Sequence, residues 1–158
     1  MHENLKTNVR EKQSATDRIC EIFDEIGWLY EREGNRVQVT FKTGVDSRAD
    51  LIICVADILS DKIYISSSAG VKAKNEVEML KLLNFINTNK IYFGRFVLTS
   101  ESSIWYDNTV DISPNEITKE QCYRAFSIAD NCCEHFCNCI VDVALGAKTA
   151  DEAIKEIK

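Results

Sequence analysis

The stretch from Val37 to Ser68 reads VQVTFKTGVDSRADLIICVADILSDKIYISSS and contains three segments that favour strands. Its first six residues alternate apolar with polar side chains, which indicates a strand with one buried face. A second run, Leu51–Leu59, is rich in β-branched residues, and a third, Lys62–Ser68, would place Ile63 and Ile65 on one side and Tyr64 on the other. Because only short turns separate the three segments, we expect an antiparallel meander.

A helix is expected before the meander, from about Ser14 to Glu33. Gly34-Asn35 follows it, and both residue types tolerate the left-handed conformation in which many helices end. The apolar residues of this segment recur at three- and four-residue spacing and would line one helix face. They are Ile19, Ile22, Phe23, Ile26 and Tyr30.

The second half of the chain contains further helices and strands. Thr118 and Gln121 have the spacing of a capping box, which places a helix start at Thr118. Ser113-Pro114-Asn115 interrupts the strand before it. In chain order we expect a helix at Asn75–Asn87, strands at Tyr92–Thr99 and Ile104–Ile112, a long helix at Thr118–Leu145 and a short helix from Thr149.

This segregation of strands and helices predicts the α+β fold class. We expect a five-stranded antiparallel sheet with helices packed on it, in the order helix, three strands, helix, two strands, helix. Residues 1–13 are polar and charged and predict a flexible tail. Residues 14–158 contain no linker and predict a single domain.

The formal net charge of −6 disfavours a nucleic-acid partner, because phosphates are held by Lys and Arg side chains. The densest group of lysines lies around one expected helix, where neighbouring glutamates dilute it, and we interpret it as a solvated face. It comprises Lys72, Lys74, Lys81 and Lys90.

No apolar run approaches the ~18 residues that a membrane span needs, and the N-terminal residues lack the apolar core of a signal peptide. We therefore expect no membrane partner and a cytoplasmic location. Thiols are reduced in that compartment, so the seven cysteines should be free.

Motifs for phosphate binding and for nucleophilic catalysis are absent from the sequence. No two glycines have the spacing of G-x-G-x-x-G or G-x-x-x-x-G-K, and there is no G-x-S-x-G. We expect no cofactor. Of the two histidines, His2 lies in the expected tail, so any histidine-based site must use His135.

The unusual segment Cys132–Cys139 reads CCEHFCNC and lies within the expected long helix. At 3.6 residues per turn, one broad face of this helix is apolar, and a free thiol on it acts as a small hydrophobe. That face comprises Cys122, Phe126, Ala129, Cys133, Phe136, Cys137, Ile140 and Ala144, whereas Ser127, Asn131, Glu134, Asn138 and Asp142 face solvent.

A metal site within this segment is limited by distance. Cys132 and Cys139 lie ~10.5 Å apart along the helix axis, too far for one zinc ion. At most two ligands could come from this segment, either His135 with Cys139 or Cys133 with Cys137. The others would have to come from Cys20, Cys54, Cys122 or carboxylates elsewhere. Core packing is the main interpretation, and a metal- or thiol-dependent enzyme or sensor using His135 and Cys139 is the alternative.

Aromatic residues gather in the last two expected strands, and they are the candidates for a protein-binding surface. They are Tyr92, Phe96, Trp105 and Tyr106. Strand alternation sends Trp105 and Tyr106 to opposite faces of the sheet, so one of them should be exposed. The residues fit either a sheet core or a patch for a partner.

Several segments resemble the YbjN-like family. They are LLNFIN at residues 82–87, GRFVL at 94–98, the strand at 104–112, Ile117-Thr118 at the start of a helix, and GAKTADEAI at 146–154. The resemblance implies a fold similar to type III secretion chaperones and a sensory-transduction regulator without established catalysis. Secretion chaperones of similar fold are small, acidic and often dimeric, and they hold an extended segment of another protein.

We therefore expect a non-enzymatic protein-binding domain, chaperone-like or regulatory. The expected partners are a protein or peptide segment and a second copy of the chain in a homodimer. The missing catalytic motifs, the acidity and the order of elements support this hypothesis.

Overall fold

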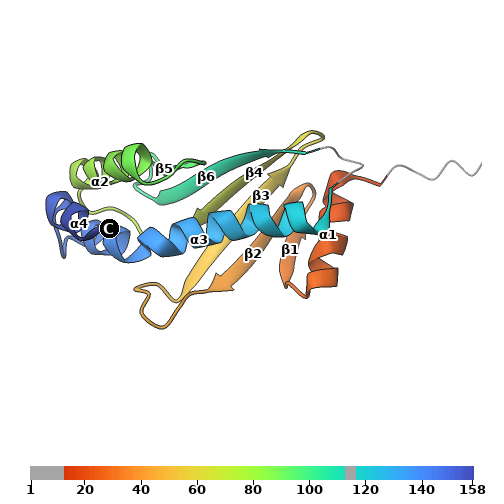
Figure 1. Ribbon diagram of the computed structural model, residues 1–158, viewed down its shortest axis with the longest axis horizontal. Coiled ribbons are helices and arrows are strands. Elements are labelled where there is room, and N and C mark those ends of the chain that lie inside the picture. The colour runs from red at the N-terminus through yellow and green to blue at the C-terminus, as the bar shows by residue number, and fades with distance from the viewer. Residues whose placement is uncertain (1–12, 113–116) are drawn as a thin grey trace, which may run out of the picture.

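The computed structural model describes residues 13–112 and 117–158, and its α+β architecture confirms the expected class (Figure 1). The expected tail at 1–13, apart from Gln13, and the strand break at Ser113-Pro114-Asn115 lie outside the described residues. The helices are α1 (Ala15–Ile26), α2 (Glu76–Asn89), α3 (Lys119–Ala144) and α4 (Ala150–Glu156). The strands are β1 (Tyr30–Glu33), β2 (Arg36–Lys42), β3 (Leu51–Ile58), β4 (Lys62–Ser68), β5 (Arg95–Leu98) and β6 (Ile104–Asp111).

The strands form a single antiparallel sheet in the order β1-β2-β3-β4-β6-β5. The expected meander is confirmed as β2, β3 and β4, and β4 has the expected bounds. From β4 the chain passes through α2 to the far edge of the sheet, forms β5 there, and returns as β6 between β5 and β4.

The sheet has six strands rather than the expected five, because the first helix is shorter than its apolar spacing predicted. α1 ends at Ile26, and Gly27 adopts a φ of +78°, which closes the helix. Tyr30, four residues after Ile26, continued the helical spacing in the sequence but begins β1 in the structure. Gly34-Asn35 is therefore the two-residue turn of a hairpin between β1 and β2.

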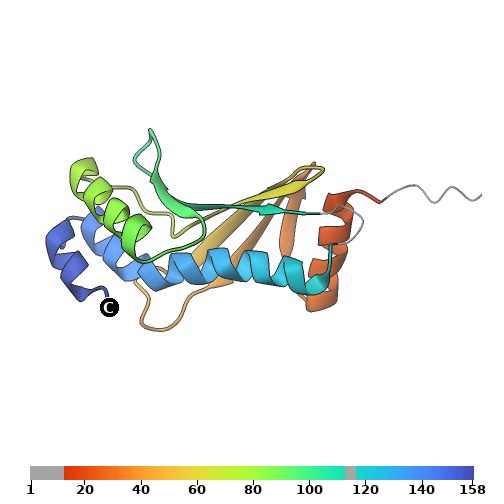
Figure 2. The same cartoon turned by 45° about the horizontal axis from the view of Figure 1, so that its top comes forward.

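The core lies between α3 and one face of the sheet (Figures 1 and 2). All eight residues of the expected apolar face of this helix are buried. Ser67 of β4 is buried opposite α3, and its hydroxyl donates a hydrogen bond of 2.9 Å to the carbonyl oxygen of Ala129. This bond satisfies a polar group inside the core and connects the sheet to the helix.

The opposite face of the sheet is not covered by any helix of the described residues (Figure 2). Tyr64 is 45% exposed there, and Val55 and Trp105 are half-buried. On the same face the Ser66 hydroxyl donates to Asp107 Oδ1 at 2.8 Å. The sheet thus has one face in the core and one face toward solvent.

The loop between β2 and β3 is held against a polar strip of α3 that we expected to face solvent. The Gly44 amide donates to Glu134 Oε1 at 2.5 Å, and the Arg48 amide donates to Asn138 Oδ1 at 2.7 Å. Asn138 Nδ2 donates to the carbonyl oxygen of Asp46 at 2.9 Å. Backbone groups of the loop therefore bind side chains of the helix.

Asp142, one turn further along this strip, is 4% exposed, so the expectation that it faces solvent was wrong. Its Oδ1 lies 2.8 Å from Arg48 Nε, and its Oδ2 lies 3.1 Å from Lys148 Nζ. A carboxylate can be buried at this position because two cations compensate its charge.

Candidate protein-binding groove

β6 is twice as long as the strand on its outer side. β5 pairs only with the first half of β6, from Ile104 to Asp107. The second half, Asn108–Asp111, pairs with β4 on its inner side. Within residues 13–112 and 117–158, no strand pairs with Asn108–Asp111 on the outer side. We call this part of the strand the β6 edge segment.

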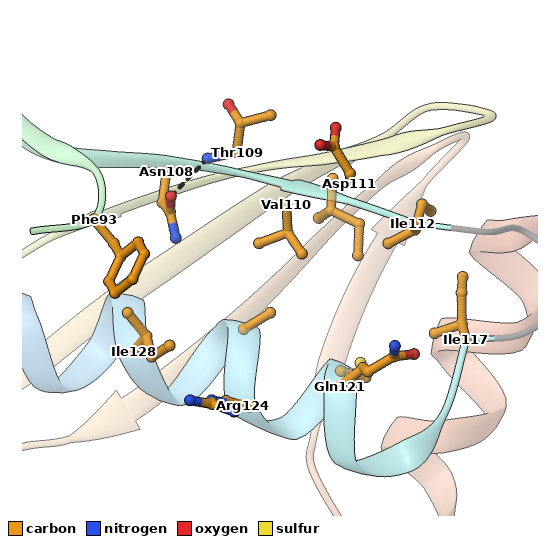
Figure 3. Close-up of a pocket in the computed structure, with 13 residues that line it drawn as sticks. Phe93, Asn108, Thr109, Val110, Asp111, Ile112, Ile117, Gln121, Arg124 and Ile128 are labelled. Carbon is orange, nitrogen blue, oxygen red and sulfur yellow. Dashed lines mark hydrogen bonds between the residues drawn. The ribbon is translucent and has the colours of Figure 1, made fainter.

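The backbone groups that face outward from the β6 edge segment follow from the register. The Ile112 amide donates to the carbonyl oxygen of Asp61 at 2.8 Å, on the β4 side. Because amides alternate sides along a strand, the amides of Thr109 and Asp111 point to the outer side. The Thr109 amide is bonded there to Asn108 Oδ1 at 2.9 Å, a side chain of the same strand (Figure 3).

β5 cannot extend alongside the β6 edge segment because of the turn at Gly94. This glycine has a φ of +67°, and a Cβ atom on it would lie 2.6 Å from the carbonyl oxygen of Asp107. The Tyr106 hydroxyl donates to the carbonyl oxygen of Phe93 at 2.6 Å and holds the turn in place. The chain therefore leaves the sheet at Gly94, and the Phe93 ring lines the space beside β6.

A groove of about 390 Å³ lies between the β6 edge segment and α3 (Figure 3). We call it the β6–α3 groove. Most of its lining is apolar, with Phe93 at one end and Ile117 near the other in Figure 3. The lining residues are Ile63, Phe93, Asn108, Thr109, Val110, Asp111, Ile112, Ile117, Gln121, Cys122, Arg124, Ala125 and Ile128.

The groove lining contains a buried thiol, Cys122, and a row of strand backbone groups. Cys122 is the nucleophilic thiol in its lining, and it is 1% exposed. Burial raises the pKa of this thiol to about 12, so it stays protonated at neutral pH. The groove instead offers an apolar floor and a row of strand backbone groups, which an extended polypeptide can use.

The four aromatic candidates are divided between the surface and the core. Tyr92 is 96% exposed and precedes Phe93 of the groove. Trp105 is half-buried on the uncovered face of the sheet. Phe96 and Tyr106 are buried and pack against each other with ring centroids 5.4 Å apart. These two cannot take part in an exposed surface, because they point toward the face that α3 covers.

His135 and Cys139, the candidates for a metal or thiol site, line a smaller cavity of about 300 Å³ between α3 and the C-terminal residues. Glu156 and Lys158 also line this cavity. The Cys139 thiol donates to the carbonyl oxygen of Phe136 at 3.1 Å, and burial raises its pKa to about 11. The cavity therefore holds a protonated thiol rather than a thiolate at neutral pH.

The cysteines of the described residues are all free. Burial raises the pKa of Cys132 to about 11 and that of Cys133 to about 12. In the part of the chain that the structure describes, no three His, Cys, Asp or Glu side chains gather closely enough to hold a metal ion. The buried thiols of α3 serve as packing residues.

No helix among the described residues is both long enough and apolar enough to span a membrane. This result agrees with the short apolar runs of the sequence.

The family model YbjN, described as "Putative bacterial sensory transduction regulator", matches residues 15–141 of this chain. The chain is similar in structure to a crystal structure of YbjN from E. coli, described as a "putative transcription regulator", with a TM-score of 0.58 and 12% sequence identity. The match covers 82% of this chain and 92% of the other and shows a shared fold. No curated protein is significantly similar in sequence.

Proposed function

The chain belongs to the YbjN family, described as "Putative bacterial sensory transduction regulator", and we propose that it is a regulatory domain. In this proposal the domain is not an enzyme and binds an extended segment of another protein. The observation that carries this proposal is the β6 edge segment beside the apolar β6–α3 groove. An extended segment would add to the sheet in line with β5 and place alternate side chains in the groove.

The size of the site suits a short strand. The β6 edge segment has four residues, and the Thr109 and Asp111 amides point outward from it. A segment paired with it would gain main-chain hydrogen bonds for affinity, and the groove would select its side chains. In this respect the proposed role is chaperone-like, because the partner would be held in an extended conformation.

A protein partner fits these features better than a nucleic acid. The groove lining contains one cation, Arg124, and one carboxylate, Asp111. A site for a phosphate backbone needs several cations on one face, and the formal net charge of the chain is −6. An apolar groove beside an open strand edge matches a polypeptide.

The outward amide of Thr109 provides the test. Thr109→Pro removes this amide but leaves the β4–β6 ladder intact, because the ladder uses the other side of the strand. Thr109→Ala keeps the amide and is the matched control. Random octapeptides displayed on phage are selected on the full chain, and the selected peptides are measured with each variant.

We expect Thr109→Pro to weaken the selected peptides at least about tenfold, since it removes a hydrogen bond and adds a ring at the edge. Thr109→Ala should change their affinity by less than about threefold. If the selected octapeptides bind wild type and Thr109→Pro with equal affinity, they bind away from the β6 edge segment, and the proposed site is wrong. Failure to select any peptide would count against the proposed function itself.

A homodimer is a further part of the proposal, supported by the resemblance to small, acidic chaperones that are often dimeric. Light scattering at micromolar concentration tests it. A dimer gives a mass of about twice the 18.0 kDa of one chain. A mass of one chain would contradict the dimer and leave the β6–α3 groove unaffected.

The alternative function, a metal- or thiol-dependent enzyme or sensor, has the shared cavity of His135 and Cys139 in its favour. The raised pKa of Cys139 argues against a reactive thiolate. Stoichiometric zinc in protein purified without chelator, lost on His135→Ala with Cys139→Ala, would support this alternative. If the double variant has the same metal content and the same peptide affinity as the wild type, the alternative function is excluded.

A further inference from the structure

Arg124 is the cation in the lining of the β6–α3 groove, and it lies on the side formed by α3. Its side chain is exposed. Among the described residues, no carboxylate lies within ion-pair distance of it, whereas Arg18, Arg32, Arg36 and Arg48 each form an ion pair. The guanidinium of Arg124 is therefore available to a bound molecule.

Asp111, the carboxylate in the same lining, does not compensate Arg124. In Figure 3 its side chain points away from α3, whereas Val110 and Asn108 point toward the helix. The charge that faces an occupant of the groove from the helix side is therefore positive. An acidic side chain on the occupant would complement it.

The spacing along α3 indicates where that acidic side chain would lie. Arg124 and Ile128 are four residues apart, which is about 6 Å along the helix axis. Two residues of a strand span about 6.8 Å and carry side chains on the same face. In Figure 3 α3 runs alongside β6, with Ile128 near Phe93 and the Arg124 side chain lower in the view, one turn back along the helix. Of two successive inward side chains of an added strand, one would therefore lie over Ile128, and the next would be the one nearest to Arg124.

We propose that the segment bound in the β6–α3 groove has the pattern apolar–x–acidic–x–apolar, with its acidic side chain paired to Arg124. This inference rests on the proposed function and specifies its partner. One apolar residue would pack against Phe93 and Ile128, and the other would lie near Ile117 at the opposite end of the groove. The residues between them would point to the uncovered face of the sheet.

Two capped heptapeptides test the pattern. One is Thr-Val-Thr-Glu-Thr-Val-Thr, and the other has Lys in place of the central Glu. Affinities are measured by calorimetry with the full-length wild type, Arg124→Ala and Arg124→Glu. Arg124 is exposed on the helix, so these variants should fold, and circular dichroism confirms that they do.

We expect wild type to bind the Glu peptide about tenfold more tightly than the Lys peptide, because one side chain is attracted to Arg124 and the other is repelled. The difference should fall below about twofold in Arg124→Ala, reverse in Arg124→Glu, and shrink as salt is raised. Equal binding of both peptides to wild type would overturn the acidic pattern but leave protein binding in place. Failure of both heptapeptides to bind, while the selected octapeptides do bind, would overturn the pattern and leave protein binding in place.

Discussion

The amide of Thr109 donates a hydrogen bond of 2.9 Å to Asn108 Oδ1, the side chain of the preceding residue on the same strand. The Asn108 side chain thus occupies an outward amide of β6 that would otherwise be open to a second strand. A binding segment would have to displace this side chain before it pairs with β6.

Asn108→Ala should therefore strengthen peptide binding, because the competing acceptor is removed. We expect an increase in affinity of about threefold for the selected octapeptides, from the loss of one intramolecular hydrogen bond in the free protein. Asn89→Ala is the control, since Asn89 bonds the carbonyl oxygen of Phe85 in α2, away from the groove. Weaker binding by Asn108→Ala would show that Asn108 contacts the peptide instead of competing with it.

Gly94→Ala should destabilise the protein strongly. The φ of +67° disfavours an L-residue, and the new Cβ would lie 2.5 Å from the Tyr106 hydroxyl. Strain and overpacking together should lower the free energy of unfolding by about 2–4 kcal/mol. Urea denaturation measures this loss.

Gly70→Ala is the matched control for the turn at Gly94. Gly70 has a φ of +75°, but no atom lies within 4 Å of a Cβ built there. The Gly70→Ala variant should lose only about 1 kcal/mol of its free energy of unfolding, because only the backbone conformation is strained. Similar losses in the two variants would contradict the claim that close packing at Gly94 fixes the end of β5.

Asp130 of α3 should make stability depend on pH. Burial, helped by nearby Glu134, raises the pKa of this carboxyl to about 6. Because the folded state disfavours the charged form, the contribution of Asp130 is fully present below about pH 4 and is lost as pH rises through 6. Asp130→Asn should therefore stabilise the protein at pH 8, by about 1 kcal/mol once solvent screening is allowed for, and not at pH 4.

The control for Asp130→Asn is Asp46→Asn, because Asp46 is exposed in the loop between β2 and β3. Thermal unfolding of wild type and both variants at the two pH values gives the result. Asp46→Asn should leave the difference between pH 4 and pH 8 unchanged. A gain for Asp130→Asn that is the same at both pH values would exclude ionisation as its cause.

Local signals in the sequence predicted most of the fold. The capping box of Thr118 and Gln121 starts α3 as expected, and the apolar spacing of that helix identified its buried face. The error at β1 came from following apolar spacing past Gly27, whose left-handed conformation ends α1. That glycine was the available signal, because helices commonly end at such a residue.

The groove could not be predicted, because it depends on contacts between distant parts of the chain. Phe93, Val110 and Ile128 come from the loop before β5, from β6 and from α3, and the groove exists only because β5 begins at Arg95 and leaves the second half of β6 unpaired by it. Asp142 was misplaced for the same reason, since its partner Arg48 is far away in the sequence. The alternation of side chains along a strand correctly placed Trp105 and Tyr106 on opposite faces of the sheet. The sequence did not show which of these faces α3 would cover.

Binding of an extended segment at the β6 edge segment can be measured directly by amide exchange, followed residue by residue by NMR with and without a selected octapeptide. We expect peptide binding to slow exchange at Thr109 and Asp111, whose amides point outward. Asn108 and Val110 should change little, because their amides already bond to β4. Protection confined to other residues, such as Val55 and Tyr64 on the uncovered face, would contradict binding at this edge.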